Sequence, residues 1–270
     1  MILGGDLGGT KTLLALAEPE GERLRIVRQQ RYESQAYASF DAVLTDFLAD
    51  RPHIDTACFG LAGPTDGHAA QLTYLPWQLR SSNLQSQFNI REVRLLNDFA
   101  AAAHGLPHVD PANLHTLHAG QPIDQAPRVI LGAGTGLGVA GLVWENGHYR
   151  IIPGEGGHFG FSPQTAQQGE LWAWLQARNG RVTTEDIVSG PGLGKIYAFL
   201  GGRPQQPETI GTAALKGSDP LALAALDLWL ACYGAFAGDL AMHWLARGGV
   251  YLAGGIATKL LPQIDCTPLV

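Results

Sequence analysis

Runs of apolar residues along the chain predict short buried strands, and between them apolar residues recur at the spacing of a helix. This alternation of strands and helices predicts an α/β protein. The predicted strands lie within residues 2–18, 56–64, 93–96 and 129–145, and the predicted helices at 37–49, 99–106, 167–180 and 219–249, with two short helices around a glycine break in 183–200.

The composition suits a compact α/β protein, because 46% of the 270 residues are hydrophobic, 16% are charged and 35 are glycine. A net charge of −6 does not favour binding to nucleic acid or to an anionic membrane. The longest apolar stretch, 221–246, is interrupted by charged residues and glycines, which favours a buried helix over a membrane span. Three cysteines in no metal-binding spacing, and an N-terminus without a basic leader, predict a reduced, soluble, cytoplasmic protein.

Two segments, 2–18 and 129–145, share one order: an apolar strand, a turn of glycine and threonine, and a second apolar strand. Backbone N–H groups with no Cβ in the way would form a cradle for phosphate at each turn. Asp6, at the mouth of the first turn, could hold a hydrated Mg²⁺ ion. The candidate nucleotide-binding residues are Asp6, Gly8, Gly9 and Thr10 in the first hairpin and Gly132, Gly134, Thr135 and Gly136 in the second.

Each hairpin taken alone is also explained by an ordinary type I′ or II′ turn in a sheet. As a pair they predict a duplicated fold whose two hairpins grip a polyphosphate from both sides. A third glycine stretch, 248–261, reads as strand, glycine pair and helix, so Gly254 and Gly255 could lie against a flat adenine. This third pattern is equally typical of a common connection between a strand and a helix.

Asp98 follows a predicted strand and opens a predicted helix. It could be an N-cap that accepts backbone N–H groups, as could its neighbour Asn97. The carboxyl end of a strand is also where α/β sheets bind ligands, and a carboxylate there could accept the proton of an attacking hydroxyl. The residue types alone leave both interpretations open.

Residues 153–160, PGEGGHFG, place Glu155 and His158 three apart with two glycines between them. A surface turn would explain the segment if Gly156 and Gly157 supplied φ > 0 and the polar side chains faced water. A loop pressed against a ligand would explain it too, with the glutamate and the histidine binding hydroxyl groups.

With these motifs in order, the chain resembles the bacterial glucokinases of the hexokinase–actin–Hsp70 ATPase superfamily. GDLGGT resembles the first phosphate motif, GAGTGLGVA the second and LAGGI the adenosine motif, while LNDF, PGEGGH and SGPGL resemble signatures specific to glucokinases. The resemblance implies a two-lobed, actin-like ATPase (ribonuclease H-like) α/β fold with a central cleft. It implies a small N-terminal domain at 1–108 and a larger domain at 109–270, where the prolines of HGLPHVDPAN interrupt both periodic patterns.

The resemblance also implies roles for individual residues. Asp98 would be the base for the 6-hydroxyl of glucose, and ATP with Mg²⁺ would bind the two hairpins and the adenosine motif. Asn97, Glu155, His158 and Glu185 would bind sugar hydroxyls. Two of these have a structural alternative, because His158 could be a packed core histidine and Glu185 an acid in the first turn of a helix.

Similar proteins continue past the adenosine motif with a further strand and helix, so we expect this chain to be short at its C-terminus. The resemblance implies an ATP-dependent glucose 6-kinase with glucose and ATP as its partners, in a possible homodimer. The alternatives are a sugar-binding regulator or inactive homologue, and a kinase of another hexose or amino sugar.

Overall fold

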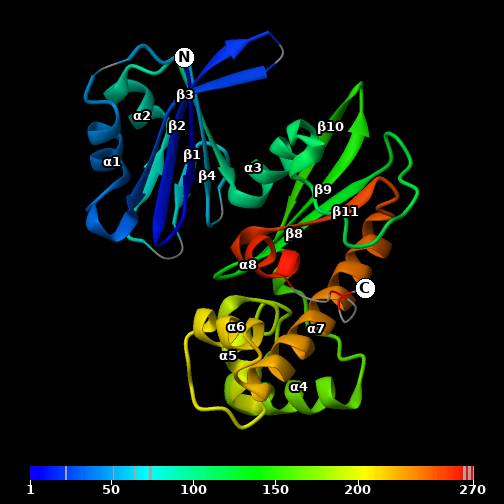
Figure 1. Cartoon of the computed structure of the whole chain (residues 1–270). Helices are drawn as coiled ribbons and strands as arrows, with labels where there is room; N and C mark the ends of the chain where they lie inside the picture. The colour runs from blue at the N-terminus through cyan, green and yellow to red at the C-terminus, as the bar shows by residue number, and fades with distance from the viewer. Residues whose placement is uncertain are drawn as a thin grey trace. The chain divides into compact units, whose positions relative to one another are not determined.

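The computed structural model describes residues 1–21, 23–50, 52–63, 65–72, 75–263, 266 and 269 (Figure 1). Its contacts divide the chain into two compact units, Met1–Ala102 and Ala103–Val270. This division falls inside a helix, shortly before the boundary at 108/109 expected from the sequence, and that domain boundary stays a prediction.

The first unit is built on a five-stranded sheet in the order β3-β2-β1-β4-β7. β1, β2 and β3 pair antiparallel, whereas β4 and β7 run parallel to β1. The strands are β1 (Ile2–Leu7), β2 (Lys11–Glu20), β3 (Arg23–Glu33), β4 (Thr56–Leu61) and β7 (Glu92–Asn97). The first two confirm the predicted hairpin within 2–18, and β4 and β7 confirm the strands predicted within 56–64 and at 93–96.

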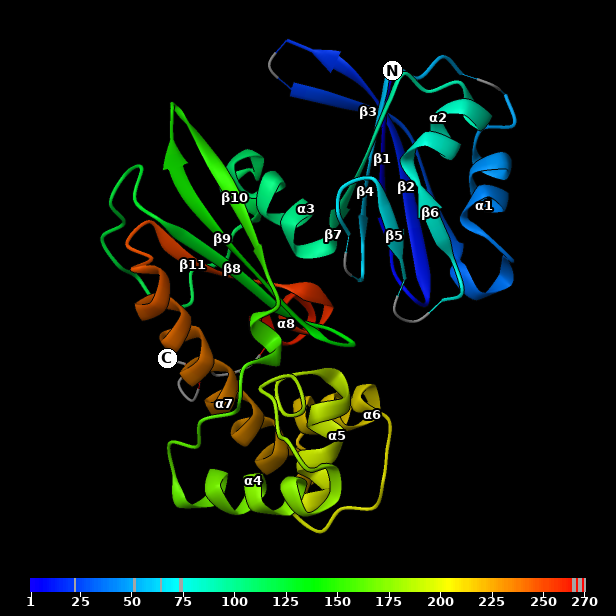
Figure 2. The ribbon, with the colours of Figure 1, turned by 180° about the vertical axis from the view of Figure 1, so that it is seen from behind.

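Helices α1 (Phe40–Phe47) and α2 (Ser81–Phe88) lie on the same side of this sheet in Figures 1 and 2, near a small ribbon of β5 (Ala69–Gln71) and β6 (Gln78–Arg80). α1 begins where the Ser39 side chain accepts the Ala42 N–H, which satisfies one of the free donors of the first turn. Its apolar face packs into the core, where the Phe40 and Phe59 rings meet edge to face with centroids 4.9 Å apart.

The second unit is built on a four-stranded sheet in the order β10-β9-β8-β11. Its strands are β8 (Arg128–Ala133), β9 (Leu137–Glu145), β10 (His148–Gly154) and β11 (Gly249–Ala253). β8, β9 and β10 pair antiparallel and β11 runs parallel to β8, as β4 runs parallel to β1 in the first unit. The strand order therefore confirms the duplicated fold predicted from the two hairpins.

The helices of the second unit are α4 (Ala166–Asn179), α5 (Gly190–Phe199), α6 (Pro207–Leu215), α7 (Pro220–Trp244) and α8 (Gly254–Leu260). In Figure 2, α7 runs from the group formed by α4, α5 and α6 towards β11. Trp229 and Tyr233 anchor α7 in the core, with both residues fully buried. By length and composition α7 could cross a membrane, but half of its most apolar window is buried inside this unit.

The prediction of two short helices within 183–200 is wrong, because the segment forms a turn followed by the single helix α5. The turn is held by Asp186, whose carboxylate accepts the Thr183 N–H at 3.0 Å and lies 2.7 Å from the Lys195 ammonium. Gly192, one of the glycines at which the sequence predicted a break between helices, lies inside α5 and is needed for close packing. A Cβ at Gly192 would lie 2.0 Å from the Ile187 carbonyl oxygen, so the close approach of the turn requires glycine there.

Helix α3 (Asp98–Gly105) follows β7 directly. The switch from strand to helix at Asn97/Asp98 therefore occurs at the residues that the sequence singled out. Because the carboxyl ends of β1, β4 and β7 lie at one edge of their parallel arrangement, the turn after β1 and the start of α3 lie at the same end of the sheet.

Candidate active site

The first hairpin turns over Gly8, Gly9 and Thr10, between β1 and β2. The Gly8 N–H donates to the Lys11 carbonyl at 3.0 Å and closes the turn. Gly9, the first of the two central residues of this turn, does not adopt the left-handed φ that a type I′ or II′ turn requires there. The ordinary hairpin turn considered from the sequence is therefore excluded here. Glycine is favoured at Gly8 for another reason, because a Cβ there would lie only 2.9 Å from the Lys11 carbonyl oxygen.

Ser34 supports this turn from the end of β3 and was not identified from the sequence. Its hydroxyl donates to the Gly8 carbonyl at 2.8 Å, and its backbone N–H donates to the Thr10 carbonyl at 2.8 Å. The Thr12 hydroxyl lies 3.0 Å from the Ser34 hydroxyl, and both residues are fully buried. A single buried serine thus fixes both ends of the turn. Only the fold reveals this role, because Ser34 is distant from the turn in the sequence.

Asp6 lies in β1 just before the turn and is exposed to solvent at the strand's end. Neighbouring protein atoms nevertheless desolvate its carboxylate and raise its pKa above the ordinary value. Among the described residues no group of three or more His, Cys, Asp or Glu side chains could hold a metal. One carboxylate beside a glycine turn fits a Mg²⁺ ion that keeps most of its water, and does not fit a closed protein cage.

Asn97 caps helix α3 with its side-chain oxygen. Its Oδ1 accepts the N–H groups of Phe99 and Ala100 at 3.0 and 3.2 Å. Asp98 is the first residue of α3, and its Oδ1 also accepts the Phe99 N–H, at 2.8 Å. The cap is therefore mainly Asn97, which accepts two N–H groups of the first turn, while Asp98 stands at the helix start.

Residues 153–160, called the sugar loop here after the role that the sequence resemblance implies, pack their backbone directly on β9. A Cβ at Gly157 would lie 2.1 Å from the Leu137 carbonyl oxygen, and one at Gly156 would lie 3.0 Å from a Val139 methyl group. Neither glycine has a left-handed φ, so the surface turn with φ > 0 is excluded. The two glycines are required by the close approach of loop and strand.

Glu155 and His158 emerge from this buried backbone with side chains 66% and 60% exposed, which excludes a packed core histidine. The His158 Nε2 and Glu155 Oε2 atoms are 4.0 Å apart, so the two polar heads lie side by side. The Glu155 carboxylate, which accepts hydrogen bonds, and the His158 imidazole, whose ring nitrogens can donate or accept them, thus extend together from one loop.

The segment 181–185 holds the sugar loop from its other side. The Arg181 side chain donates to the His158 carbonyl at 3.0 Å, and the Thr184 N–H donates to the Phe159 carbonyl at 2.9 Å. The Glu185 N–H donates to the Gly157 carbonyl at 2.9 Å, while the Glu185 carboxylate accepts the Leu137 N–H at 2.7 Å. Glu185 lies in the turn before α5, so it is not a first-turn acid of a helix.

The second hairpin turns over Gly134, Thr135 and Gly136, and Gly132 lies within β8. Gly134 donates to the Gly136 carbonyl at 2.8 Å and accepts the N–H of Gly190, the first residue of α5, at 2.8 Å. As in the first hairpin, the turn glycines have no left-handed φ.

The predicted adenosine motif lies beside this second turn. Gly254 has φ +86°, which favours glycine, and a Cβ there would lie 2.7 Å from the Ala133 carbonyl oxygen. A Cβ at Gly255 would meet nothing within 4 Å, so its backbone has open space in front of it. The second unit thus brings the sugar loop, the second hairpin and the Gly254–Gly255 pair to neighbouring positions on β8 and β9.

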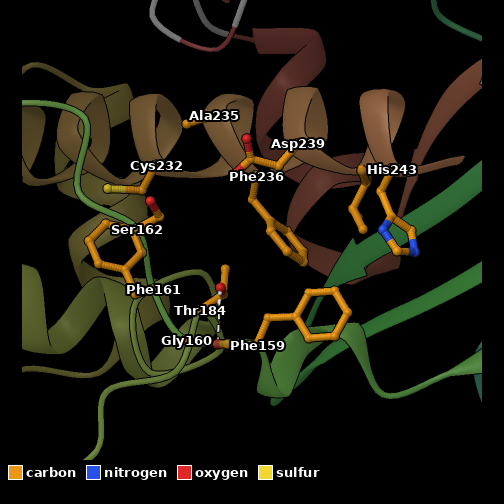
Figure 3. A pocket seen from close by; sticks show the side chains of 11 residues that line it. Phe159, Gly160, Phe161, Ser162, Thr184, Cys232, Ala235, Phe236, Asp239 and His243 are labelled. Atoms are coloured by element: carbon orange, nitrogen blue, oxygen red, sulfur yellow. Dashed lines mark hydrogen bonds between the residues drawn. The ribbon is translucent and has the colours of Figure 1, made fainter. Parts of the chain in front are cut away.

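A cavity of about 190 Å³ lies between the sugar loop and α7 (Figure 3). Phe159, Phe161 and Thr184 line it from the loop side, opposite Phe236 and His243 on α7. Cys232 also lines it, and burial raises the pKa of this thiol to about 12, so the cavity holds no reactive thiolate. Neither Glu155 nor His158 lines this cavity, whose lining combines three phenylalanine rings with polar side chains such as Ser162 and Asp239. Glu155 lines a neighbouring cavity, which shares Phe159, Leu240 and His243 with the first.

Comparisons with known proteins agree on one family. The glucokinase family model matches residues 3–268. A glucokinase from Nostoc punctiforme is 37% identical over 98% of this chain and 87% of its own length, and one from Mesorhizobium japonicum is 37% identical over 97% and 79%.

Solved structures show the same fold. A glucokinase from an Antarctic psychrotroph superposes with a TM-score of 0.86 at 28% identity, covering 100% of this chain and 87% of that one. A glucose complex of Balamuthia mandrillaris glucokinase gives a TM-score of 0.78 at 22% identity, covering 99% and 83% of the two chains. A ROK family glucokinase from Streptomyces griseus, in complex with glucose and AMPPNP, gives 0.64 at 20% identity, covering 99% and 86%. The α/β fold class of these sugar kinases is confirmed, and the chain belongs to the glucokinase family.

Proposed function

We propose that this chain transfers the γ-phosphoryl group of ATP to the 6-hydroxyl of D-glucose and releases glucose 6-phosphate and ADP. The observation that carries the proposal is the sugar loop, whose backbone is fixed on β9 while Glu155 and His158 stay exposed. Membership of the glucokinase family supports it, as do the glucose and AMPPNP complexes of proteins with the same fold.

Four side chains bind the sugar in this proposal: Asn97, Glu155, His158 and Glu185. A hydrogen bond to a charged group contributes about 1.5–3 kcal/mol. Several such bonds together would reject a sugar that lacks one hydroxyl, because the unmatched carboxylate or imidazole would lose its partner. The side-chain oxygen of Asn97 caps α3, so its side-chain NH₂ group is the part that would donate to a sugar hydroxyl.

Asp98 is the base in this proposal. Its carboxylate accepts the proton of the 6-hydroxyl as that oxygen attacks the γ-phosphorus, while the bond from phosphorus to the β,γ-bridging oxygen breaks and ADP leaves. The cap at Asn97 supports the assignment, because it fixes the start of α3 and so limits the positions of the Asp98 carboxylate.

The nucleotide is held by the two hairpins and by Gly254 and Gly255. Turn N–H groups without a Cβ in front of them donate to phosphate oxygens, and the open backbone at Gly255 faces the adenine. Asp6 would hold Mg²⁺ through water, and a bound Mg²⁺ neutralises the charge that builds up on the phosphate oxygens.

The substitution Asp6→Asn is expected to raise Tm at neutral pH and to abolish turnover. Because neighbouring protein atoms partly desolvate the Asp6 carboxylate and raise its folded-state pKa above the unfolded value, this carboxylate destabilises the folded state at pH values above both. The gain in Tm should therefore shrink as the pH falls through the folded-state pKa and vanish below the unfolded one. Thermal melts of both proteins from pH 3 to pH 8 measure this, and an unchanged Tm difference at all pH values would contradict it.

The proposal is tested by a coupled assay for glucose 6-phosphate with the purified chain, glucose, ATP and MgCl₂, beside thermal melts with and without glucose. Turnover supports the kinase. A glucose-raised Tm without turnover would favour a sugar-binding regulator. Faster turnover of mannose, glucosamine or N-acetylglucosamine than of glucose would favour a kinase of another sugar.

A cytoplasmic location and a homodimeric assembly belong to the same proposal. Glucose and ATP meet in the cytoplasm, and Cys58 and Cys232 are thiols that form no disulfide, as that compartment favours. Light scattering coupled to size exclusion measures the assembly directly.

A further inference from the structure

Glu185 contacts two parts of the proposed site at once. Its backbone N–H donates to the Gly157 carbonyl in the sugar loop at 2.9 Å. Its carboxylate oxygen Oε2 accepts the N–H of Leu137, the first residue of β9 after the second phosphate turn, at 2.7 Å. One residue therefore connects the loop that carries Glu155 and His158 to the turn of the second hairpin.

The hairpin leaves room for this carboxylate. A Cβ at Gly136 would lie 2.6 Å from Glu185 Oε2, so the carboxylate occupies the space that a side chain at 136 would fill. A hydrogen bond to an ionised acceptor is roughly twice as strong as one between neutral groups. Glycine at 136 thus has a second role besides exposing backbone to phosphate: it lets Glu185 reach the turn.

The carboxylate also keeps acceptor capacity for a ligand. Oε2 is the atom bonded to Leu137, whereas Oε1 lies 3.8 Å from the position of a Cβ at Gly136 and so is farther from the turn. A carboxylate offers about four acceptor positions over its two oxygens. A sugar hydroxyl that donates to Oε1 would restrict the same side chain that holds the phosphate turn.

We propose that Glu185 couples sugar binding to nucleotide binding within the second unit. It is a positioning residue for the nucleotide, acting through Leu137, as well as an acceptor for a sugar hydroxyl. The inference rests on the proposed function. Coupling between two ligands is reciprocal, so glucose tightens the nucleotide by the same factor by which the nucleotide tightens glucose.

Titration calorimetry with Mg·ADP in the presence and absence of saturating glucose tests this. In the unsubstituted chain, saturating glucose is expected to lower the Kd for Mg·ADP by about tenfold, within the usual range of such couplings. In Glu185→Gln, which keeps the size of the side chain and removes its charge, the ratio should fall to about twofold or less. The reciprocal titration, glucose with and without Mg·ADP, should give the same ratio in each protein.

Two further variants separate coupling from simple support. In Gly136→Ala the new Cβ would push the Glu185 carboxylate away from the turn. Gly136 has no left-handed φ, so the backbone accepts alanine, and this variant should lose the coupling as Glu185→Gln does. Arg181→Ala removes a hydrogen bond to the His158 carbonyl in the same sugar loop. Within the part of the chain that the structure describes, the Arg181 side chain makes no hydrogen bond to the hairpin, so the variant should weaken glucose binding and keep the tenfold ratio.

Equal ratios in the unsubstituted chain and Glu185→Gln would overturn the inference, as would a ratio near one in the unsubstituted chain. In both cases turnover of glucose would still stand, which distinguishes failure of the coupling from failure of the proposed function. No glucose binding and no turnover by the unsubstituted chain would overturn both.

Discussion

Substituting Asp98→Asn is expected to lower kcat about 10²–10⁴-fold, the usual contribution of a general base. The carboxamide has the shape of the carboxylate and keeps an oxygen that accepts the Phe99 N–H, so the start of α3 should be unchanged. It cannot accept a proton at neutral pH. The loss should therefore fall on kcat, while KM for glucose and the glucose-induced rise in Tm stay near those of the unsubstituted chain.

Asp110→Asn is the matched control for Asp98→Asn. Asp110 also accepts a backbone N–H at a helix start, from Ala112 at 2.9 Å, and it is exposed to solvent. Steady-state kinetics of both variants should show full activity for Asp110→Asn. A kcat within tenfold of the unsubstituted chain for Asp98→Asn would show that another group takes the proton.

Replacing Gly157 with alanine is expected to destroy the sugar site with only one methyl group. The new Cβ would lie 2.1 Å from the Leu137 carbonyl oxygen, which is backbone and cannot turn aside as a side chain could. The loop must therefore lift from β9 and carry Glu155 and His158 with it. A misplacement of about 1 Å can cost about 10²-fold in rate, and we expect at least that loss in kcat/KM for glucose. Overpacking should also lower the free energy of unfolding by about 1–3 kcal/mol.

Gly160→Ala provides the control within the same loop. A Cβ at Gly160 would meet nothing within 4 Å, and its φ is not left-handed, so the loop can accept it. Urea unfolding and glucose kinetics of the two variants give the comparison. Normal glucose kinetics in Gly157→Ala would mean that glucose binding does not depend on the packing of the loop backbone against β9.

The features that the sequence predicted well are those in which local pattern and chemistry agree. The strand, turn and strand of 2–18 and 129–145, and the switch at Asn97/Asp98, depend on neighbouring residues, and the structure confirms the elements. The repeated strand order could also be inferred, because two hairpins of the same kind imply two sheets built in the same way.

The contacts that hold the site together could not be predicted, because they join residues distant in sequence. Ser34 looks like one of many serines until β3 brings it under the first turn. Glu185 was expected to bind sugar, but nothing in its own segment indicates that its carboxylate accepts the Leu137 N–H. Left-handed backbone was one of two explanations that the sequence left open for the glycines of the sugar loop, whereas close packing on β9 is what requires them.

The pairing of β8 with β11 has a consequence for folding. β8 and β9 form a local hairpin, but the partner of β8 on its other edge begins only at Gly249. During synthesis this edge of an apolar strand must stay open until α4 to α7 have been made, and open apolar edges are sites of aggregation. Closing so long a loop also makes the pairing slow compared with the hairpins. The sheet beside the turn of the second hairpin is therefore complete only after β11 has been synthesised and has paired with β8.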